Sequence, residues 1–464
     1  MADDIQDKSW QGESAILSIA DFIADPVAAA DFPEAILRWR NDRAARDIGL
    51  AGLDDAQWIA HFGRFQPLPD SLATPLALRY HGHQFRVYNP DIGDGRGFLF
   101  AQCRDDAGRL LDLGTKGSGT TPYSRSGDGR LTLKGAVREL LATEMLAALG
   151  VATSRTFSIV ETGEQLWRGD EPSPTRSAVL VRLSHGHIRI GSFQRLAAID
   201  DGASLIRLAR YSLVELLGHD RATIDAMPPQ ALAETLLAAM VPRAADLAAS
   251  YMVAGFVHGV LNSDNIAITG ESFDYGPWRF APTWAPAFTA AYFDHGGLYS
   301  FGRQPETLHW NCAQLAIALR TIADAQPLIA ILEGFADAYR DAFVKRFLWR
   351  LGVAARDPAS DLALVEAAER MMVATSLPID RFFFAYAAGR GASGDEPGRA
   401  FEELLARHRP ARALDDRYWS GDAPQAMLID EVEAIWAAIA ERDDWTPLTD
   451  KIAAVRAFGA VMSA

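Results

Sequence analysis

The alternation of hydrophobic and polar positions changes character along the chain. Between residues 76 and 200, short apolar runs alternate with polar residues and are separated by Asp, Gly and Ser clusters. This is typical of strands joined by turns. The pattern predicts strands at 97–104 and 109–116, and two later strands at 156–161 and 178–189.

A helical repeat follows the second of these strands. Apolar residues occur there at the spacing of one helix face, namely at Leu133, Val137, Leu140, Leu141, Met145 and Leu149. Thr132 precedes them as a candidate N-cap, and Gly150 follows as a candidate stop. The pattern therefore predicts one long helix between the two pairs of strands.

The rest of the chain is mostly helical in pattern. A glycine- and proline-rich stretch at 257–305 interrupts it, and 389–398 is expected to be a mobile loop. The chain divides into four segments: a helical and irregular extension at 1–75, a lobe of strands and turns at 76–200, a helical lobe at 201–345, and a helical extension at 346–464.

Composition and charge narrow the classes of partner. Hydrophobic residues make up 49% of the 464 residues, enough for a large core, and the net charge is −15. So acidic a chain is not expected to bind nucleic acid or an anionic membrane, and a phosphate site must be a local basic pocket. The apolar stretch at 236–260 contains Arg243 and Asp246 and is expected to fall short of a membrane span.

The N-terminal residues and the cysteines bear on the expected cellular compartment. Cys103 and Cys312 form no metal-like cluster, so a reduced protein without an obligate disulfide is expected. The first residues are acidic and lack an apolar segment of the signal-peptide kind. Both features favour a cytoplasmic location.

The tetrapeptide Gly-Asp-Gly-Arg occurs twice, at 93–96 and at 127–130. Asp-Gly is the commonest short hairpin-turn signal, so each copy alone reads as a turn with a solvated arginine. The sequence around the two copies favours a functional interpretation. Glycines 93, 95 and 97 precede the strand pair, Lys116 ends it, and Glu139 lies 23 residues later in the predicted helix. This order resembles a two-lobed protein kinase, where a strand lysine holds phosphates and pairs with a helix glutamate.

The glycine-rich stretch of the second lobe contains His258 and then the polar run Asn262-Ser263-Asp264-Asn265, followed by Asp274-Tyr275-Gly276. In a kinase such an asparagine and aspartate hold the metal, and oxygen ligands suit Mg²⁺. The position of the kinase base holds Val260, which cannot accept a proton. Either the chain is inactive, or another residue is the base. Asp264 is the nearest candidate.

Arg182 and Arg189 fall where a kinase builds its adenine pocket. Guanidinium groups pair with phosphate oxygens, so these arginines indicate phosphate in a place where a kinase has adenine. The pairs His81/His83 and His185/His187 lack a third ligand in the sequence, which argues against a zinc site.

Together these stretches resemble the selenoprotein O family, the kinase-like protein adenylyltransferases. The stretches that carry the resemblance are HGHQFRVYNPDIGDGRG (81–97), LGTKGSGTTPYSRSGDGRLTLKGAVRELLATE (113–144), HGVLNSDNIAITGESFDYGP (258–277) and the run 294–310 containing YSFGRQP. The resemblance implies an α+β, two-lobed protein-kinase-like fold with an extra N-terminal segment and C-terminal helices. It also implies transfer of AMP from ATP, bound in reversed orientation, to Ser, Thr or Tyr hydroxyls of protein substrates.

The resemblance also assigns roles. Asp264 is the proton acceptor, Lys116 contacts phosphate and pairs with Glu139, and Mg²⁺ is held by Asn265 and Asp274. The remaining nucleotide contacts are Gly93, Gly95, Arg96, Asp128, Gly129, Arg182 and Arg189. UMP transfer with Mn²⁺ is a variant that related members suggest.

The chain departs from the family pattern in two places. His81 and Arg86 replace the usual alanine and glycine around Gly-His-Gln-Phe. The C-terminal part lacks the cysteine or selenocysteine that many members carry near that end, which puts redox control through a terminal thiol in doubt. The alternatives to AMP transfer are an ordinary ATP phosphotransferase and a catalytically inactive pseudokinase scaffold.

Overall fold

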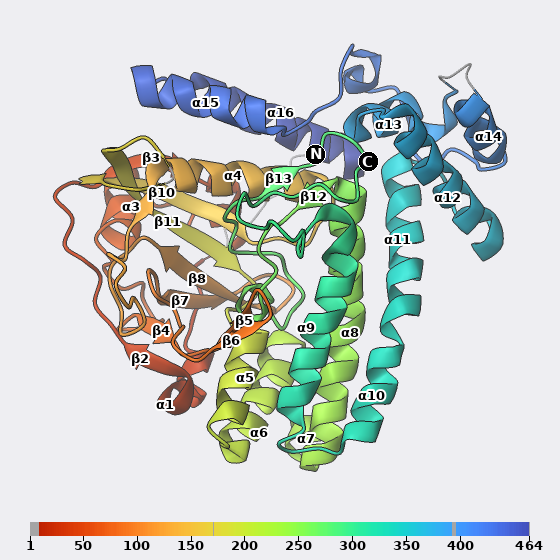
Figure 1. The fold of residues 1–464 in the computed structure, drawn as a ribbon. Coiled ribbons are helices and arrows are strands. Elements are labelled where there is room, and N and C mark those ends of the chain that lie inside the picture. Colours follow the sequence, from red (N-terminus) through yellow and green to blue (C-terminus); the bar gives the residue numbers. More distant parts are fainter. Residues whose placement is uncertain (1–8, 170, 392–395, 464) are drawn as a thin grey trace.

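The fold joins a large antiparallel sheet to an array of helices (Figure 1). The computed structural model describes residues 9–169, 171–391 and 396–463. In this part the main sheet has nine strands and runs in the order β2-β4-β7-β8-β11-β10-β3, with β1 paired to β7 and β9 paired to β11. Its strands are β1 (Gly12–Glu13), β2 (Ala24–Pro26), β3 (Ile36–Arg40), β4 (Leu76–Leu78), β7 (Leu99–Arg104), β8 (Leu110–Lys116), β9 (Leu131–Thr132), β10 (Arg155–Leu166) and β11 (Thr175–Ser184).

The central hairpin and the helix after it are as predicted. Strands β7 and β8 pair antiparallel, and α4 (Leu133–Ala148) follows. Thr132 caps α4 by accepting a hydrogen bond from the Gly135 amide, and Gly150 ends the turn with φ +73°. Helix α4 lies across one face of the sheet, and the other face packs against the N-terminal α2 (Asp42–Asp47) and α3 (Asp55–Phe62).

Two sequence predictions about strands were wrong. The N-terminal segment contains α1 (Ala20–Ile23), α2 and α3, but it also supplies β1, β2 and β3 to the sheet. These strands are two to five residues long, too short to show alternation. The strand expected at 178–189 ends at Ser184, because Gly186 takes a left-handed φ of +85° and Arg189 instead caps α5 (Ile190–Ala198).

The helices form the second half of the molecule. Helix α8 (Pro229–Ala254) packs against α9 (Gln304–Leu319) and α11 (Phe335–Leu351) (Figure 1). The other helices of this half are α6 (Gly202–Tyr211), α7 (Arg221–Asp225), α10 (Ala325–Glu333), α12 (Pro358–Thr375), α13 (Ile379–Ala385), α14 (Glu396–Leu405), α15 (Ile429–Arg442) and α16 (Thr446–Ser463). By length and composition α8 would suffice to cross a membrane, contrary to the sequence expectation, but most of its apolar window is buried inside the protein.

The C-terminal helices close over α4 (Figure 1). Arg456 of α16 donates two hydrogen bonds to Glu144 of α4, at 2.8 and 2.6 Å, and Glu433 of α15 accepts one from Lys134 at 2.6 Å. Part of the loop expected at 389–398 lies outside the described residues, and α14 already begins at Glu396. The C-terminal extension thus braces the helix that carries Glu139.

Two short strand pairs flank the segment between Val257 and Arg279, which we call the polar segment. β12 (Phe256–Val257) pairs with β13 (Arg279–Phe280) and brings together the two ends of the segment that holds Asp264 and Asp274. The hairpin of β5 (Gly82–Gln84) and β6 (Val87–Asn89) packs against a 3₁₀ turn at Ser263–Asn265. The loop is therefore held from both sides.

Candidate active site

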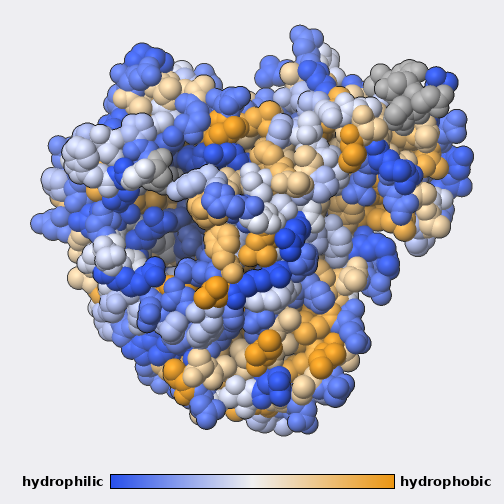
Figure 2. Space-filling view, viewed as in Figure 1, coloured by the Kyte–Doolittle hydropathy of each residue, from blue (hydrophilic) through white to orange (hydrophobic). Residues whose placement is uncertain are grey.

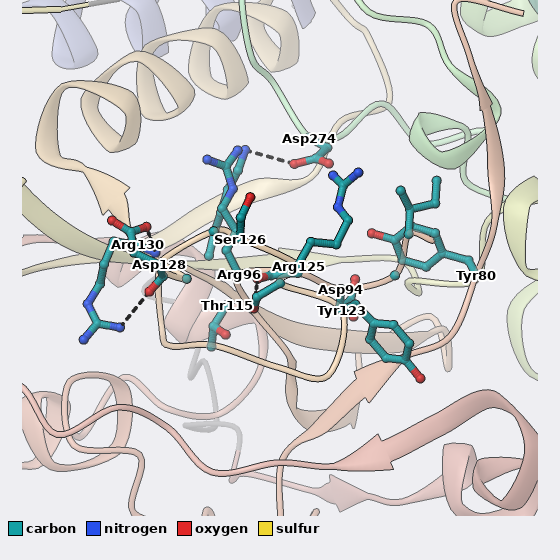
Figure 3. Close-up of a pocket in the computed structure, with 18 of the residues that line it drawn as sticks. Tyr80, Asp94, Arg96, Thr115, Tyr123, Arg125, Ser126, Asp128, Arg130 and Asp274 are labelled. Atoms are coloured by element: carbon teal, nitrogen blue, oxygen red, sulfur yellow. Dashed lines mark hydrogen bonds and ion pairs between the residues drawn. The ribbon is translucent and has the colours of Figure 1, made fainter. Parts of the chain in front are cut away.

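Both Gly-Asp-Gly-Arg copies line one cavity of about 550 Å³, together with Asp274 from the polar segment (Figure 3). The first copy is not a hairpin turn, because the strands on either side of it pair with other strands. Gly93 of this copy is needed because its backbone lies close to Tyr123: a Cβ at Gly93 would lie 2.4 Å from the Tyr123 ring. Gly129 of the second copy instead needs its positive φ of +70°.

Strand register explains how the cationic groups meet. In the β8–β11 pair, Lys116 lies opposite Leu180 and Gly114 lies opposite Arg182. Opposed residues share a face, and so do residues two apart, so Lys116 and Arg182 both face α4. There Lys116 Nζ lies 2.7 Å from Glu139 Oε2, and Arg182 Nη1 lies 3.8 Å from Glu139 Oε1.

Asp274 is the carboxylate on which these cations converge. Its Oδ1 lies 2.9 Å from Lys116 Nζ and 3.4 Å from Arg182 Nη1. Figure 3 shows it entering the cavity opposite the loop that carries Arg125 and Ser126. Burial alone would raise the pKa of Asp274, but the neighbouring lysine and arginines hold this pKa well below its ordinary value. Asp274 is therefore an anion. A ligand that binds beside it must either contact this carboxylate or compete with it for the cationic side chains.

Arg189 is buried in the wall of the same cavity, and its Nη1 lies 4.0 Å from Asp274 Oδ2. It donates to Asp94 Oδ1 at 3.1 Å and to the main-chain carbonyl of Asp264 at 3.1 Å. Burial works to lower the pKa of Arg189, but Tyr80 and the surrounding carboxylates outweigh this effect, and the pKa is raised. Arg189 is thus a permanent cation in a fixed position.

The 3₁₀ turn places Asp264 beside the cavity but not in its wall. The Asp264 carboxylate packs against β5, where a Cβ added to Gly82 would lie 2.9 Å from its Oδ1. That oxygen is buried and has no hydrogen-bond partner among the described residues. Burial raises the pKa of Asp264 to about 6. Such a carboxylate is poised to take up a proton from a group brought against it.

The neighbouring residues of the loop have supporting contacts. Asn265 Nδ2 donates to the carbonyl of Val260 at 3.0 Å, which leaves its side-chain oxygen as the atom that can meet a cation. His258 is buried, and its Nε2 lies 3.1 Å from the carbonyl oxygen of Phe273. Asn265 and Glu139, like Asp264, do not line the cavity.

The predicted residues account for only part of the cavity. Its lining also includes Arg125, Arg168, Tyr80 and Tyr123, and the Asp94 and Arg130 members of the two Gly-Asp-Gly-Arg copies, to which the sequence assigned no individual role. Asp128 was predicted, and its carboxylate lies 2.9 Å from Arg168. Across the lining, seven cationic side chains face three carboxylates. An acidic chain therefore builds the local basic pocket that a phosphate ligand requires.

The paired histidines have protein partners. His187 Nδ1 lies 3.0 Å from Asp112, His81 Nδ1 lies 2.7 Å from the Tyr88 hydroxyl, and His83 Nδ1 lies 2.7 Å from Gln194 Nε2. The two cysteines of the described residues, Cys103 and Cys312, are both buried, and neither forms a disulfide. Burial raises the pKa of Cys312 to about 12, so its thiol is unreactive.

Comparison with known proteins assigns the chain to a family. The sequence model described as "Protein adenylyltransferase SelO" matches residues 8–409. The chain belongs to this family. "Protein nucleotidyltransferase YdiU" of Gloeobacter violaceus is 44% identical over 96% of this chain and 94% of its own length. The protein of the same name from Synechococcus elongatus is 48% identical over 94% of this chain and 93% of its own length. The resemblance stated from the motifs is confirmed.

Membership of the SelO family makes the chain a protein nucleotidyltransferase that uses ATP and acts on proteins. The seven cationic side chains of the cavity suit the several negative charges of a nucleoside triphosphate.

Proposed function

We propose that the chain transfers AMP from ATP to Ser, Thr or Tyr hydroxyls of proteins, with ATP bound in reversed orientation between two kinase-like lobes. The observation that carries the proposal is the convergence of Arg182 and Arg189 with both Gly-Asp-Gly-Arg copies on one cavity. A wall built from buried arginines suits phosphates and would be a poor site for an adenine base. Reversal of ATP would bring its phosphates to this wall and leave the α-phosphate to be attacked.

The transfer step assigns roles to the residues around the cavity. The acceptor oxygen attacks the α-phosphorus, a new O–P bond forms, and the bond from that phosphorus to pyrophosphate breaks. The hydroxyl proton passes to the carboxylate of Asp264. Lys116, Arg182 and Arg189 stabilise the negative charge that grows on the phosphate oxygens. Glu139 is a positioning residue, since it holds Lys116 at 2.7 Å without lining the cavity.

A divalent cation fits the donor chemistry of the polar segment. The Asp274 carboxylate and the Asn265 side-chain oxygen are hard ligands of the kind that Mg²⁺ or Mn²⁺ prefers. Bound there, the cation would neutralise phosphate charge. The carboxylate of Asp274 reaches the cavity, so we propose it as the main protein ligand, with Asn265 second.

Removal of Asp274 should abolish the metal dependence of ATP binding. In Asp274→Ala, ATP affinity measured by calorimetry should be the same with and without Mg²⁺, whereas the unaltered protein should bind tighter with the metal. Asn265→Ala should lose less, because a neutral amide attracts a cation less than a carboxylate does. Asp128→Ala is the matched control, since it removes a cavity carboxylate that pairs with Arg168. Persistent metal dependence in Asp274→Ala would refute the assignment.

ATP labelled at single phosphates separates the proposal from its alternatives. We expect label to enter protein from the α-phosphate and not from the γ-phosphate, with a mass gain of one AMP per modified hydroxyl. Label from the γ-phosphate would establish an ordinary phosphotransferase. ATP binding without any transfer would establish an inactive scaffold. Parallel reactions with UTP and Mn²⁺ would test whether UMP is also donated.

A further inference from the structure

An exposed apolar surface lies beside the β5–β6 hairpin, which packs against the 3₁₀ turn that carries Asp264. It consists of Phe85 and Val87 from the β5–β6 hairpin and of Tyr292 and Phe293, which follow β13 in the glycine- and proline-rich stretch 257–305; we call it the apolar platform. Val87 is 70% exposed, Tyr292 77% and Phe293 42%. The ring centroids of Phe85 and Phe293 lie 5.8 Å apart. Figure 2 shows hydrophobic residues gathered over the β5–β6 region at the centre of this face.

The hairpin part of the apolar platform is hydrogen-bonded to the polar run Asn262–Asn265. The Phe85 amide donates to Asn262 Oδ1 at 3.0 Å, and the His83 amide donates to Ser263 Oγ at 2.7 Å. The Tyr299 hydroxyl donates to the same Asn262 oxygen at 2.6 Å. Hydrogen bonds from main-chain amides of the hairpin to side chains of the loop therefore fix the hairpin relative to Asp264.

The hairpin tip is held in a conformation that its residues disfavour. Phe85 and Arg86 take φ values of +50° and +63°, in the left-handed region that glycine and asparagine usually occupy. Arg86 is held by Glu306 at 2.8 Å and by the face of Trp310 at 5.4 Å. Backbone strain of this kind persists where surrounding contacts impose it, and it is concentrated at functional sites.

We propose that the apolar platform docks the polypeptide of the protein substrate, through an aromatic or aliphatic side chain close to the acceptor hydroxyl. The proposal rests on the function above, because it takes Asp264 as the group that the hydroxyl must reach. A polypeptide that brings its hydroxyl to Asp264 must pass the β5–β6 hairpin, which packs on that side chain. The neighbouring charges of Arg86, Arg303 and Glu306 are paired with one another, so an apolar contact suits this surface better than an anionic lipid or a phosphate.

Two synthetic peptides and two double variants test the proposal. Each peptide carries one serine, flanked by Leu and Phe in one peptide and by Ala and Gln in the other. The test variant is Val87→Ser/Tyr292→Ser. The matched control is Ile317→Ser/Val373→Ser, which alters residues of α9 and α12 that are 58% and 56% exposed. AMP incorporation is measured by intact mass over a range of peptide concentrations, and ATP affinity is measured by calorimetry.

We expect the unaltered protein to prefer the apolar peptide. The test variant should raise the KM for that peptide about tenfold or more, with kcat, ATP affinity and Tm unchanged. The control should behave as the unaltered protein does. Val87→Ile/Tyr292→Phe keeps the surface apolar and should retain the original KM.

The outcomes separate the docking proposal from the proposed function. An equal KM in the test variant, or no preference between the peptides, would overturn the docking role. Transfer of the γ-phosphate to either peptide would instead overturn AMP transfer, whatever the peptide preference.

Discussion

Asp264→Ala should bind ATP and fail to transfer AMP. Loss of a general base typically slows a reaction by ~10²- to 10⁴-fold. ATP affinity should survive for two structural reasons. The Asp264 side chain does not line the cavity, and its link to Arg189 runs through the main-chain carbonyl, which alanine retains. The measurement is ATP calorimetry beside AMP transfer followed by intact mass.

Asp264→Asn provides the companion variant. It keeps the shape of the side chain and removes only its ability to take up a proton, so it should lose transfer as Asp264→Ala does. Asp294→Asn is a useful control. Asp294 lies in the same glycine- and proline-rich stretch 257–305 and accepts hydrogen bonds from two main-chain amides at 2.8 Å, but it does not line the cavity. Transfer near the normal rate in both Asp264 variants would show that no base is needed or that it lies elsewhere.

The sequence could predict the parts of the site that lie close together in the chain. Lys116 ends a strand and Glu139 lies on the next helix, so both the pair and its spacing are local features, and the structure brings them to 2.7 Å. The Thr132 cap and the Gly150 stop were predicted for the same reason, since capping depends on a few adjacent residues.

Contacts between distant segments could not be predicted in this way. Arg189 meets Asp94 across 95 residues of sequence, and the His83 amide meets Ser263 across 180. Nothing in the local sequence pattern relates these segments to one another. They come into contact only through the packing of the whole fold. Arg125 and Arg168 were overlooked because an arginine beside a turn usually faces solvent.

Short edge strands were missed for a related reason. β3 has apolar and charged residues that are all only half-buried, because it pairs with β10 at the rim of the sheet. A strand of this kind gains its stability from its neighbour and not from its own alternation. The strand that was predicted too long ends at Ser184, two residues before Gly186, whose φ is left-handed.

Lys116→Ala should lose both ATP binding and transfer. Lys116 Nζ is buried between the carboxylates of Glu139 and Asp274, and it lines the cavity. Removal of a charge-assisted phosphate contact costs roughly 1.5–3 kcal/mol, equivalent to about a ten- to hundredfold weaker affinity for ATP. Transfer should fall further, because the same charge stabilises the transition state. Calorimetry and AMP incorporation measure the two losses separately.

The same substitution should also destabilise the fold, and this effect must be separated from the loss of binding. Glu139 is buried and would keep only Arg182, at 3.8 Å, as a cationic neighbour; removal of one partner of a buried ion pair costs up to about 3–5 kcal/mol. Lys116→Met/Glu139→Gln removes both charges and should recover much of the free energy of unfolding, measured by denaturant, without recovering ATP binding. Lys134→Ala is the matched lysine control, since Lys134 pairs with Glu433 at 2.6 Å away from the cavity. Strong ATP binding by the folded double variant would show that Lys116 serves the structure of α4 and not the nucleotide.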